Sequence, residues 1–162
     1  MEIKELIDKL ESERPQKWKE FPDFMIYKDQ LIAFMEKQHI GLSESETITS
    51  AMINNYTKSG LLPRAEGKKY GKEHIAYLTM TCLLKQILQV DEVSVLMKNY
   101  INDDVEETYG TYLEMLDKEF KEAVESIDID SDEKRYDLAM RLAVSSYTQK
   151  LICQKLIEDM DK

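Results

Sequence analysis

The stretch TITSAMINNYTKSGLLPRAEGKKYGK, residues 47–72, decides the fold that the rest of the chain is expected to take. Thr49 is a typical N-cap residue, because its side-chain oxygen can accept an N–H of the first helical turn. Gly60 supplies a left-handed helix stop, and Pro63 prevents the helix from resuming. The stretch therefore predicts a short helix over residues 49–59, followed by a turn over residues 63–72.

Helical winding at about 100° per residue divides this short helix into two faces. One side is predicted to be apolar and to carry Ile48, Ala51, Met52 and Tyr56. The opposite side is predicted to be polar and to carry Ser50, Asn54, Thr57 and Lys58. Because a helix of this length is not stable alone, we expect the apolar side to dock on neighbouring helices and the polar side to face outward.

The same stretch is a basic island on an acidic chain. Residues 49–72 contain five cations and one anion, a net charge of +4, whereas the whole chain carries −10 and the remainder therefore −14. Phosphate binding needs local cations, and an acidic remainder discourages non-specific adhesion. Charge alone also fits a solvated, lysine-rich surface loop.

A family resemblance favours the first interpretation. ITSAMINNYTKSGLLP at 48–63, a short basic turn, and YGKEHIAYLTMTCLLKQILQVDEVSVL at 70–96 resemble the mercury-resistance-regulator (MerR) superfamily over about residues 27–99. With Tyr27, Asp29 and Gln30 beside residues 52–56, most of the chain resembles the bacterial domain of unknown function 1836 family. The resemblance implies a winged helix-turn-helix and transcriptional regulation. It implies no particular ligand.

Within that resemblance, residues 49–59 form the recognition helix and residues 63–72 a basic wing. Asn54 is the candidate base reader, because an amide can bond bidentately to adenine in the major groove. The candidate DNA-contacting residues are Ser50, Asn54, Asn55, Thr57, Lys58, Arg64, Lys68, Lys69, Tyr70 and Lys72, with the cations on phosphates and Tyr70 either packed under the wing or on a sugar. In typical MerR-type regulators arginine often stands at the position of Asn54 and an aromatic residue at that of Asn55, so a different specificity is expected. His74 is expected either to contact a phosphate or to complete a helix cap.

The fold class predicted for the whole chain is all-α: a MerR-like winged helix-turn-helix with a small wing and a C-terminal helical extension. Three parts are expected to pack as one compact domain: an N-terminal helix and linker (1–26), the winged helix-turn-helix (27–102) and a C-terminal helical hairpin (103–162). Helices are predicted over residues 2–12, 27–38, 73–89, from 91, 103–127 and 133–160, with a polar turn over 41–46. The helix over 73–89 is apolar on almost every face, which predicts a central position.

Tyrosine and methionine residues recur along the later helices: Met97, Tyr109, Tyr112, Met115, Tyr136, Met140, Tyr147 and Met160. These side chains either pack in the core or line an adaptable pocket, and core packing is the more common outcome. The aromatic residues of the 15–24 linker, Trp18, Phe21 and Phe24, are likewise expected to pin the linker to the core.

Little in the sequence points to a membrane, a metal or catalysis. No secretory signal is evident, and the least polar run, 75–90, is interrupted by polar residues and too short to span a bilayer. Cys82 and Cys153 lack metal-like spacing and are expected to be small buried hydrophobes in a reducing cytoplasm. Asp128, Asp130 and Asp132 imitate the start of a calcium loop, but Glu133 and Ala139 stand where that loop needs glycine and glutamate. His39 is expected to end a helix. We expect no enzyme activity and no cofactor.

The predicted function is a cytoplasmic, DNA-binding transcriptional regulator that works as a homodimer on a pseudo-palindromic duplex site. Because fold does not dictate function, an alternative stays open. In it, the winged-helix scaffold does not bind DNA and instead serves as a protein-interaction module, through the acidic C-terminal surface, or as a small-molecule sensor.

Overall fold

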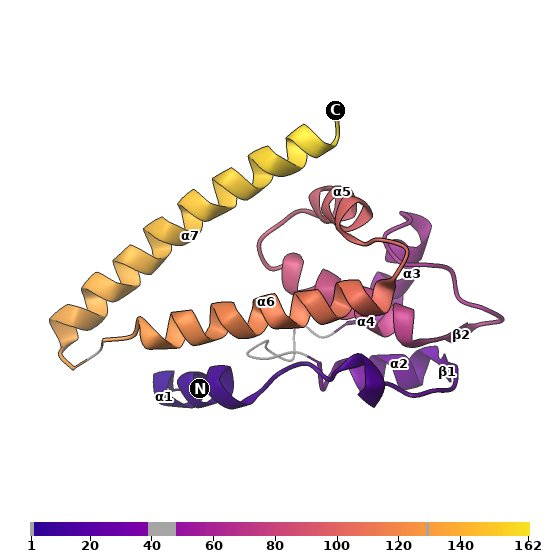
Figure 1. Cartoon of the computed structure of the whole chain (residues 1–162), viewed down its shortest axis with the longest axis horizontal. Helices are drawn as coiled ribbons and strands as arrows, with labels where there is room; N and C mark the ends of the chain where they lie inside the picture. Colours follow the sequence, from indigo (N-terminus) through magenta and orange to yellow (C-terminus); the bar gives the residue numbers. More distant parts are fainter. Residues whose placement is uncertain (1, 39–47, 129) are drawn as a thin grey trace.

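The computed structural model describes residues 2–38, 48–128 and 130–162. It is mostly helical, which confirms the all-α class, and the expected turn at 41–46 and His39 lie outside the described residues. The described elements are α1 (Ile3–Ser12), a 3-10 turn η1 (Trp18–Glu20), β1 (Ile26–Tyr27), α2 (Lys28–Met35), α3 (Ser50–Lys58), β2 (Lys69–Tyr70), α4 (Lys72–Leu84), α5 (Val90–Tyr100), α6 (Val105–Glu125) and α7 (Asp132–Met160) (Figure 1).

Helix α4 is the centre of the fold, as its all-round apolar sequence predicts. Eight of its residues are buried, among them Ile75, Leu78 and Met80, and the helix contacts α2, α5, α6 and β2. It ends at Leu84 rather than at 89, and Ile87 is 48% exposed. Residues 85–88 form a turn, and Gln89 then caps the next helix, where the Glu92 side chain accepts the Gln89 N–H at 2.8 Å.

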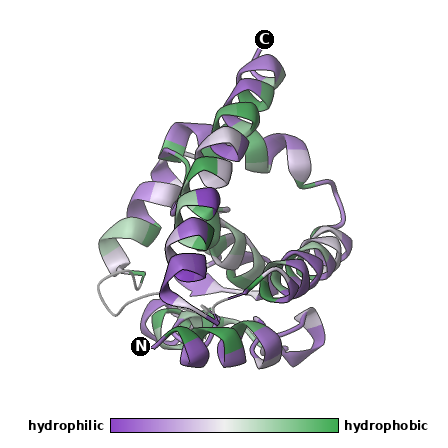
Figure 2. Cartoon of the chain, turned by 90° about the vertical axis from the view of Figure 1, so that its left-hand side faces the viewer, coloured by the Kyte–Doolittle hydropathy of each residue, from purple (hydrophilic) through white to green (hydrophobic). Residues whose placement is uncertain are grey.

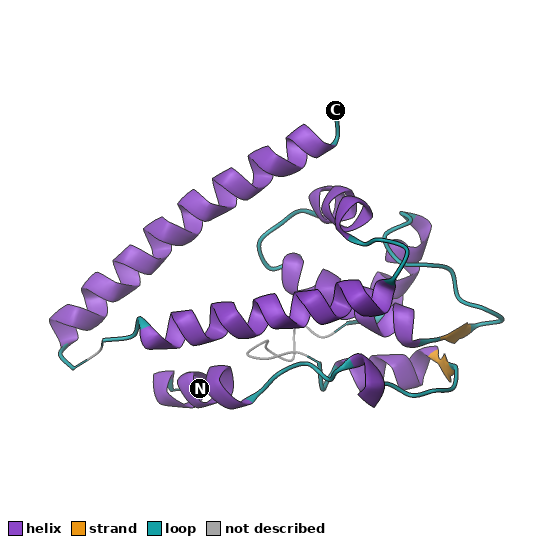
Figure 3. Cartoon of the chain, viewed as in Figure 1, coloured by secondary structure: helices purple, strands orange, loops and turns teal. Residues whose placement is uncertain are grey.

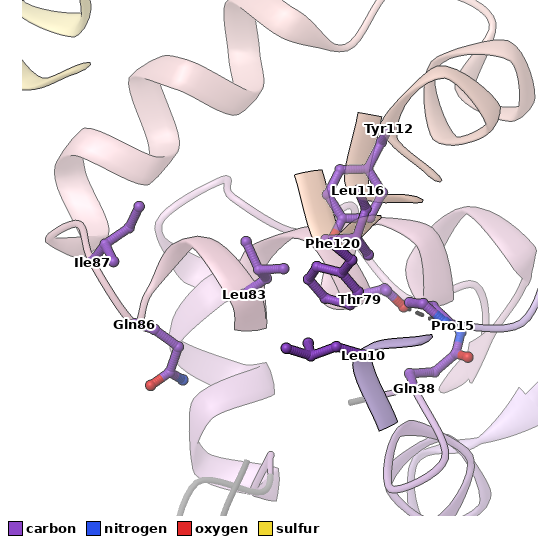
Figure 4. A pocket seen from close by; sticks show the side chains of 10 residues that line it. All are labelled: Leu10, Pro15, Gln38, Thr79, Leu83, Gln86, Ile87, Tyr112, Leu116 and Phe120. Carbon is purple, nitrogen blue, oxygen red and sulfur yellow. Dashed lines mark hydrogen bonds between the residues drawn. The ribbon is translucent and has the colours of Figure 1, made fainter. Parts of the chain in front are cut away.

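A chain of hydrogen bonds joins α6 to α4 through the segment that follows α1. The Tyr109 hydroxyl donates to the Gln16 carbonyl at 2.8 Å, and the Gln16 N–H donates to Oε1 of Gln38 at 2.8 Å. The Gln38 amide then donates to Oγ1 of Thr79 at 3.2 Å (Figure 4). Gln38 and Thr79 are each 1% exposed, so these bonds satisfy polar groups that would be costly to bury unpaired.

The N-terminal segment packs along α6. Arg14 holds this segment against α6 through two contacts. Its Nη2 lies 2.8 Å from the Asp117 carboxylate, and its guanidinium lies 5.1 Å from the centre of the Phe120 ring. The Lys121 ammonium, together with two Arg14 nitrogens that reach the same carboxylate, holds the Asp117 pKa below its usual value. Phe21 is buried against Tyr109, as expected of the linker, but Phe24 is 69% exposed and does not pin it.

Helix α7 diverges from α6 and leaves most of its apolar side chains uncovered (Figure 1). Only Leu138 and Ile157 are buried in it. Of the tyrosine and methionine set, Met97, Tyr109 and Tyr112 are in the core as predicted, whereas Met115, Tyr136, Met140, Tyr147 and Met160 are exposed. Core packing was therefore the wrong expectation for α7, because helical periodicity reveals an apolar face but not whether a neighbour covers it.

The turn between α6 and α7 holds the aspartates that imitate a calcium loop. The Lys134 ammonium lies 2.7 Å from Asp128 and 3.7 Å from Asp130, and Ser131 supplies the N-cap of α7. The two cysteines carry free thiols, Cys82 buried in α4 and Cys153 half-buried in α7. Within the described ranges, no helix is both long enough and apolar enough to cross a membrane.

Candidate nucleic-acid interface

Helix α3 has the caps that the sequence predicts. Oγ1 of Thr49 accepts the Met52 N–H at 3.2 Å, which satisfies one of the unpaired donors of the first turn. After the helix, Gly60 adopts a φ of +77°, the left-handed conformation that favours glycine at a helix stop. These two residues fix the start and the end of the candidate recognition helix.

The buried side of α3 differs by one residue from the prediction. Ala51 is exposed, and Ile53 is fully buried beside Tyr56 and Ile48. The larger aliphatic side chain removes more apolar surface from water than alanine would, so the helix turns toward Ile53. The polar side follows a four-residue spacing, with Ser50, Asn54 and Lys58 all exposed. We call these three residues the α3 ridge.

Thr57 and Asn55 lie next to the ridge residues, and Thr57 is half-buried whereas Asn55 is exposed. The Thr57 hydroxyl donates to the Ile53 carbonyl at 2.9 Å, so its proton is used within the helix. Asn55 is exposed, one helical step of about 100° from Asn54.

The wing is a tight two-residue turn. The backbones of Glu66 and Lys69 exchange two hydrogen bonds of 2.9 and 3.0 Å, and Gly67 and Lys68 between them adopt φ values of +54° and +67°. Positive φ at both central residues is the signature of a type I′ hairpin turn. Beyond it, β2 pairs antiparallel with β1, which lies before α2 in the chain, at one end of the molecule (Figure 3). The turn holds Lys68 at the wing tip.

His74 of the central helix forms hydrogen bonds with both ends of the wing. Its Nδ1 accepts the Gly71 N–H at 3.0 Å, so Nε2 carries the proton and donates to the Arg64 carbonyl at 3.2 Å. The ring is 5% exposed and meets Tyr70 edge-on at 5.1 Å. Of the alternatives the sequence left open, the structure therefore has His74 in a cap and Tyr70 packed under the wing.

The cations of the basic island differ in their availability. Lys58, Arg64 and Lys68 are exposed, whereas Lys72 forms an ion pair of 2.7 Å with Asp23. The half-buried Lys69 places its ammonium 5.3 Å from the centre of the Tyr27 ring. The structure thus divides the predicted phosphate contacts into exposed cations and cations that also hold the wing in place.

A groove of about 940 Å³ lies between the start of α3 and the wing. It is lined by residues of β1, α2, α3 and the wing: Tyr27, Lys28, Asp29, Ile32, Ser50, Ala65, Lys68 and Tyr70. Ser50, at the start of α3, and Lys68, at the wing tip, therefore face one hollow. We call this hollow the ridge–wing groove.

Lys28 is the residue of this site that sequence reasoning missed. Its ammonium donates to Oδ1 of Asn54 at 2.6 Å, from a helix that precedes α3 in the chain. The available signal was the Tyr27–Gln30 segment, because the Gln30 side chain accepts the Tyr27 N–H at 2.9 Å and so begins α2 at Lys28.

Further hollows lie away from the ridge–wing groove. One of about 280 Å³ is lined mainly by apolar side chains of α1, α4 and α6, with the paired Gln38 and Thr79 at its edge (Figure 4). The second, of about 500 Å³, lies between α4, α5 and α6 and has Glu119 as its one charged lining residue.

Comparison with known proteins yields one match. The model of a family described as "Domain of unknown function (DUF1836)" matches residues 16–120, well over half of the 162-residue chain. No curated protein and no solved structure matches. The matched range contains the ridge, the wing, the ridge–wing groove and the hydrogen-bond chain between α4 and α6.

Proposed function

We propose that this chain, which belongs to the DUF1836 family, binds duplex DNA through the α3 ridge and the wing as a MerR-like transcriptional regulator. The observation that supports the proposal is the ridge–wing groove, which has Ser50 of the ridge and Lys68 of the wing tip in its lining. In this arrangement α3 enters the major groove and the wing lies on the adjacent backbone, as in helix-turn-helix recognition.

The contact between Lys28 and Asn54 supports a base-reading role for Asn54. The Lys28 ammonium can only donate, so the atom of Asn54 that it contacts is the amide oxygen. The amide nitrogen of Asn54 is then the atom that can donate to a base. The oxygen retains a second lone pair. An amide held in this way can donate to adenine N7 and accept from adenine N6, the bidentate pattern that distinguishes this base.

The exposed cations suit phosphate contacts. Lys58 ends the ridge, Lys68 stands at the wing tip, and Arg64 is exposed between them in the chain. Cations in these places neutralise the DNA backbone and fix the position of the helix without reading sequence. The remainder of the chain carries a net charge of −14, which disfavours non-specific adhesion to DNA. A homodimer would present two such regions to a pseudo-palindromic site.

Salt-dependent binding to random duplex DNA tests the proposal. Fluorescence anisotropy compares the wild type with Lys58→Ala/Lys68→Ala/Lys69→Ala over a range of salt concentrations. A matched control, Lys4→Ala/Lys98→Ala/Lys118→Ala, removes the same charge from exposed lysines of α1, α5 and α6. We expect the site variant to lower the salt slope by about 1 for each lost phosphate contact, and the control to leave it unchanged.

Two outcomes would contradict the proposal. One is the absence of wild-type binding at low salt, and the other is an equal loss in the site variant and the control. Either result would favour the alternative of a protein-interaction or sensing role for the same scaffold.

A further inference from the structure

Helix α7 carries an uncovered apolar stripe. Tyr136, Met140, Val144, Tyr147 and Leu151 are between 48% and 75% exposed. At about 100° per residue they fall within an arc of about 80°, so they form one continuous surface along the helix. Hydrophobic residues recur along α7 in Figure 2. A contiguous apolar surface of this kind on a folded protein marks an interaction site. We call the five residues the α7 stripe.

The stripe is not the side by which α7 is attached to its own chain. Attachment is to α5, where Ile157 is buried, Cys153 is half-buried and the Gln154 amide donates to Glu92 at 2.6 Å. Cys153 and Ile157 lie about 100–140° around the helix from the middle of the stripe. The stripe could reach the body of its own chain only if these contacts broke.

The same chain offers a surface that such a stripe fits. The hollow of about 500 Å³ between α4, α5 and α6 is lined almost entirely by apolar side chains, including Met80, Leu84, Leu96, Tyr100, Met115 and Phe120. Met115 is 51% exposed at its edge. Methionine and aromatic side chains adapt their shape to a helix laid against them. We call this hollow the apolar groove.

The net charges of α6 and α7 indicate which surface binds in the apolar groove. Helix α6, which forms one wall, carries seven acidic and two basic residues, a net charge of −5. The middle of α7, residues 134–155, contains the stripe and carries five basic residues and one acidic residue, a net charge of +4, whereas the other four acidic residues of α7 lie at its two ends. Pairing α7 with a second α7 would bring like charges together, whereas pairing α7 with α6 brings opposite charges together.

We propose that the apolar groove binds the α7 stripe of a second copy of this chain. A two-fold axis makes the contact reciprocal, because each chain inserts its stripe and offers its groove. This inference deepens the homodimer within the proposed function. It is tested without DNA, so its failure leaves DNA binding by a monomer intact, and the failure of the salt experiment leaves the dimer intact.

Mass in solution tests the contact. Analytical ultracentrifugation of the full chain is expected to give twice the chain mass of 19.0 kDa for the wild type. The stripe variant Met140→Glu/Tyr147→Glu and the groove variant Met115→Glu are each expected to give the single-chain mass. All three positions are exposed, so circular dichroism should show unchanged helix content. The control Leu142→Glu changes a side chain that is 48% exposed on the opposite side of α7, and it is expected to stay dimeric.

Mixing the two variants separates this contact from other modes of pairing. A stripe variant retains a normal groove and a groove variant retains a normal stripe, so their mixture can form one intact contact and regain the dimer mass. A wild type that stays at 19.0 kDa at high micromolar concentration would overturn the proposal. So would a groove variant that remains dimeric alone, or a mixture that remains monomeric.

Discussion

The ammonium of Lys28 donates a 2.6 Å hydrogen bond to Oδ1 of Asn54 and so joins the first turn of α2 to the α3 ridge. Under the proposed function this contact orients the base-reading amide. Lys28→Met keeps much of the side-chain stem but removes the donor. We expect about 3- to 10-fold weaker binding to the preferred site, within the range that the net contribution of a typical hydrogen bond, about 0.5–1.5 kcal/mol, represents. We also expect a relaxed preference at one adenine position.

Site selection from a random duplex library, followed by anisotropy on the selected site, measures both effects of Lys28→Met. Lys4→Met, on the exposed part of α1, is the control for lost charge. If Lys28→Met selects the same site with the same stringency as Lys4→Met, Lys28 has no orienting role.

Under the proposed function, a substitution of Lys68 at the wing tip changes folding stability and DNA binding in opposite directions. Lys68 has a φ of +67°, which asparagine tolerates better than lysine. We therefore expect Lys68→Asn to raise the free energy of unfolding by up to about 1 kcal/mol in urea titrations, because it relieves an unfavourable backbone conformation. The same change should weaken DNA binding because it removes an exposed cation. A variant that loses stability and binding together would show that Lys68 has a structural role instead.

His74 is expected to be a structural residue of the wing. His74→Ala removes a buried ring, the acceptor for the Gly71 N–H and the donor to the Arg64 carbonyl. We expect the free energy of unfolding to fall by about 2–4 kcal/mol, from two lost hydrogen bonds and a cavity. Urea titration measures the change, with the exposed neighbour Glu73→Ala as the control. A loss below about 1 kcal/mol would mean that the wing is held mainly by β1 and Tyr70.

Cys82 gives the fold a pH dependence in the alkaline range. Burial raises the pKa of its thiol from the ordinary value of 9.0 to about 11. The unfolded chain therefore loses this proton before the folded chain does, and the stabilising contribution is complete below pH 9 and is lost as pH rises toward 11. By pH 10 the loss is about 1.4 kcal/mol.

Urea titrations of the wild type and Cys82→Ala at pH 8, 9 and 10 measure this contribution. The difference in the free energy of unfolding between the wild type and Cys82→Ala should fall by about 1.4 kcal/mol over this range. The buried tyrosines, whose pKa values burial also raises, titrate in both proteins and therefore cancel in the difference. A difference that stays constant over this range would mean that the Cys82 thiol titrates normally in the folded state.

Local signals in the sequence predicted much of the fold. Thr49, Gly60 and the apolar run of α4 act within a few residues, and the caps and the central position of α4 agree with the prediction, although α4 ends five residues early. The polar side of α3 was also predicted, because helical winding determines which residues share a face. The error at Ala51 and Ile53 came from assigning the buried side by position rather than by the size of the side chain.

Contacts between distant residues could not be predicted from the same signals. Lys28 and Asn54 are 26 positions apart, and β2 pairs with a strand that precedes α2. The uncovered stripe on α7 has a related cause. Its pattern requires an apolar neighbour, but a pattern within one helix does not say whether that neighbour belongs to the same chain.

The hydrogen-bond chain from Tyr109 through Gln16 and Gln38 to Thr79 fixes the axial position of α6 over α4. The hydrophobic effect has no preferred direction, whereas hydrogen bonds lose alignment when their partners move by about an ångström. A displacement of α6 by one helical turn, about 5.4 Å, would separate the Tyr109 hydroxyl from the Gln16 carbonyl that accepts its proton. The segment after α1 thus determines where α6 lies along α4. Movements of α6 relative to α4 are therefore expected to be tilts and rotations, not translations along the helix.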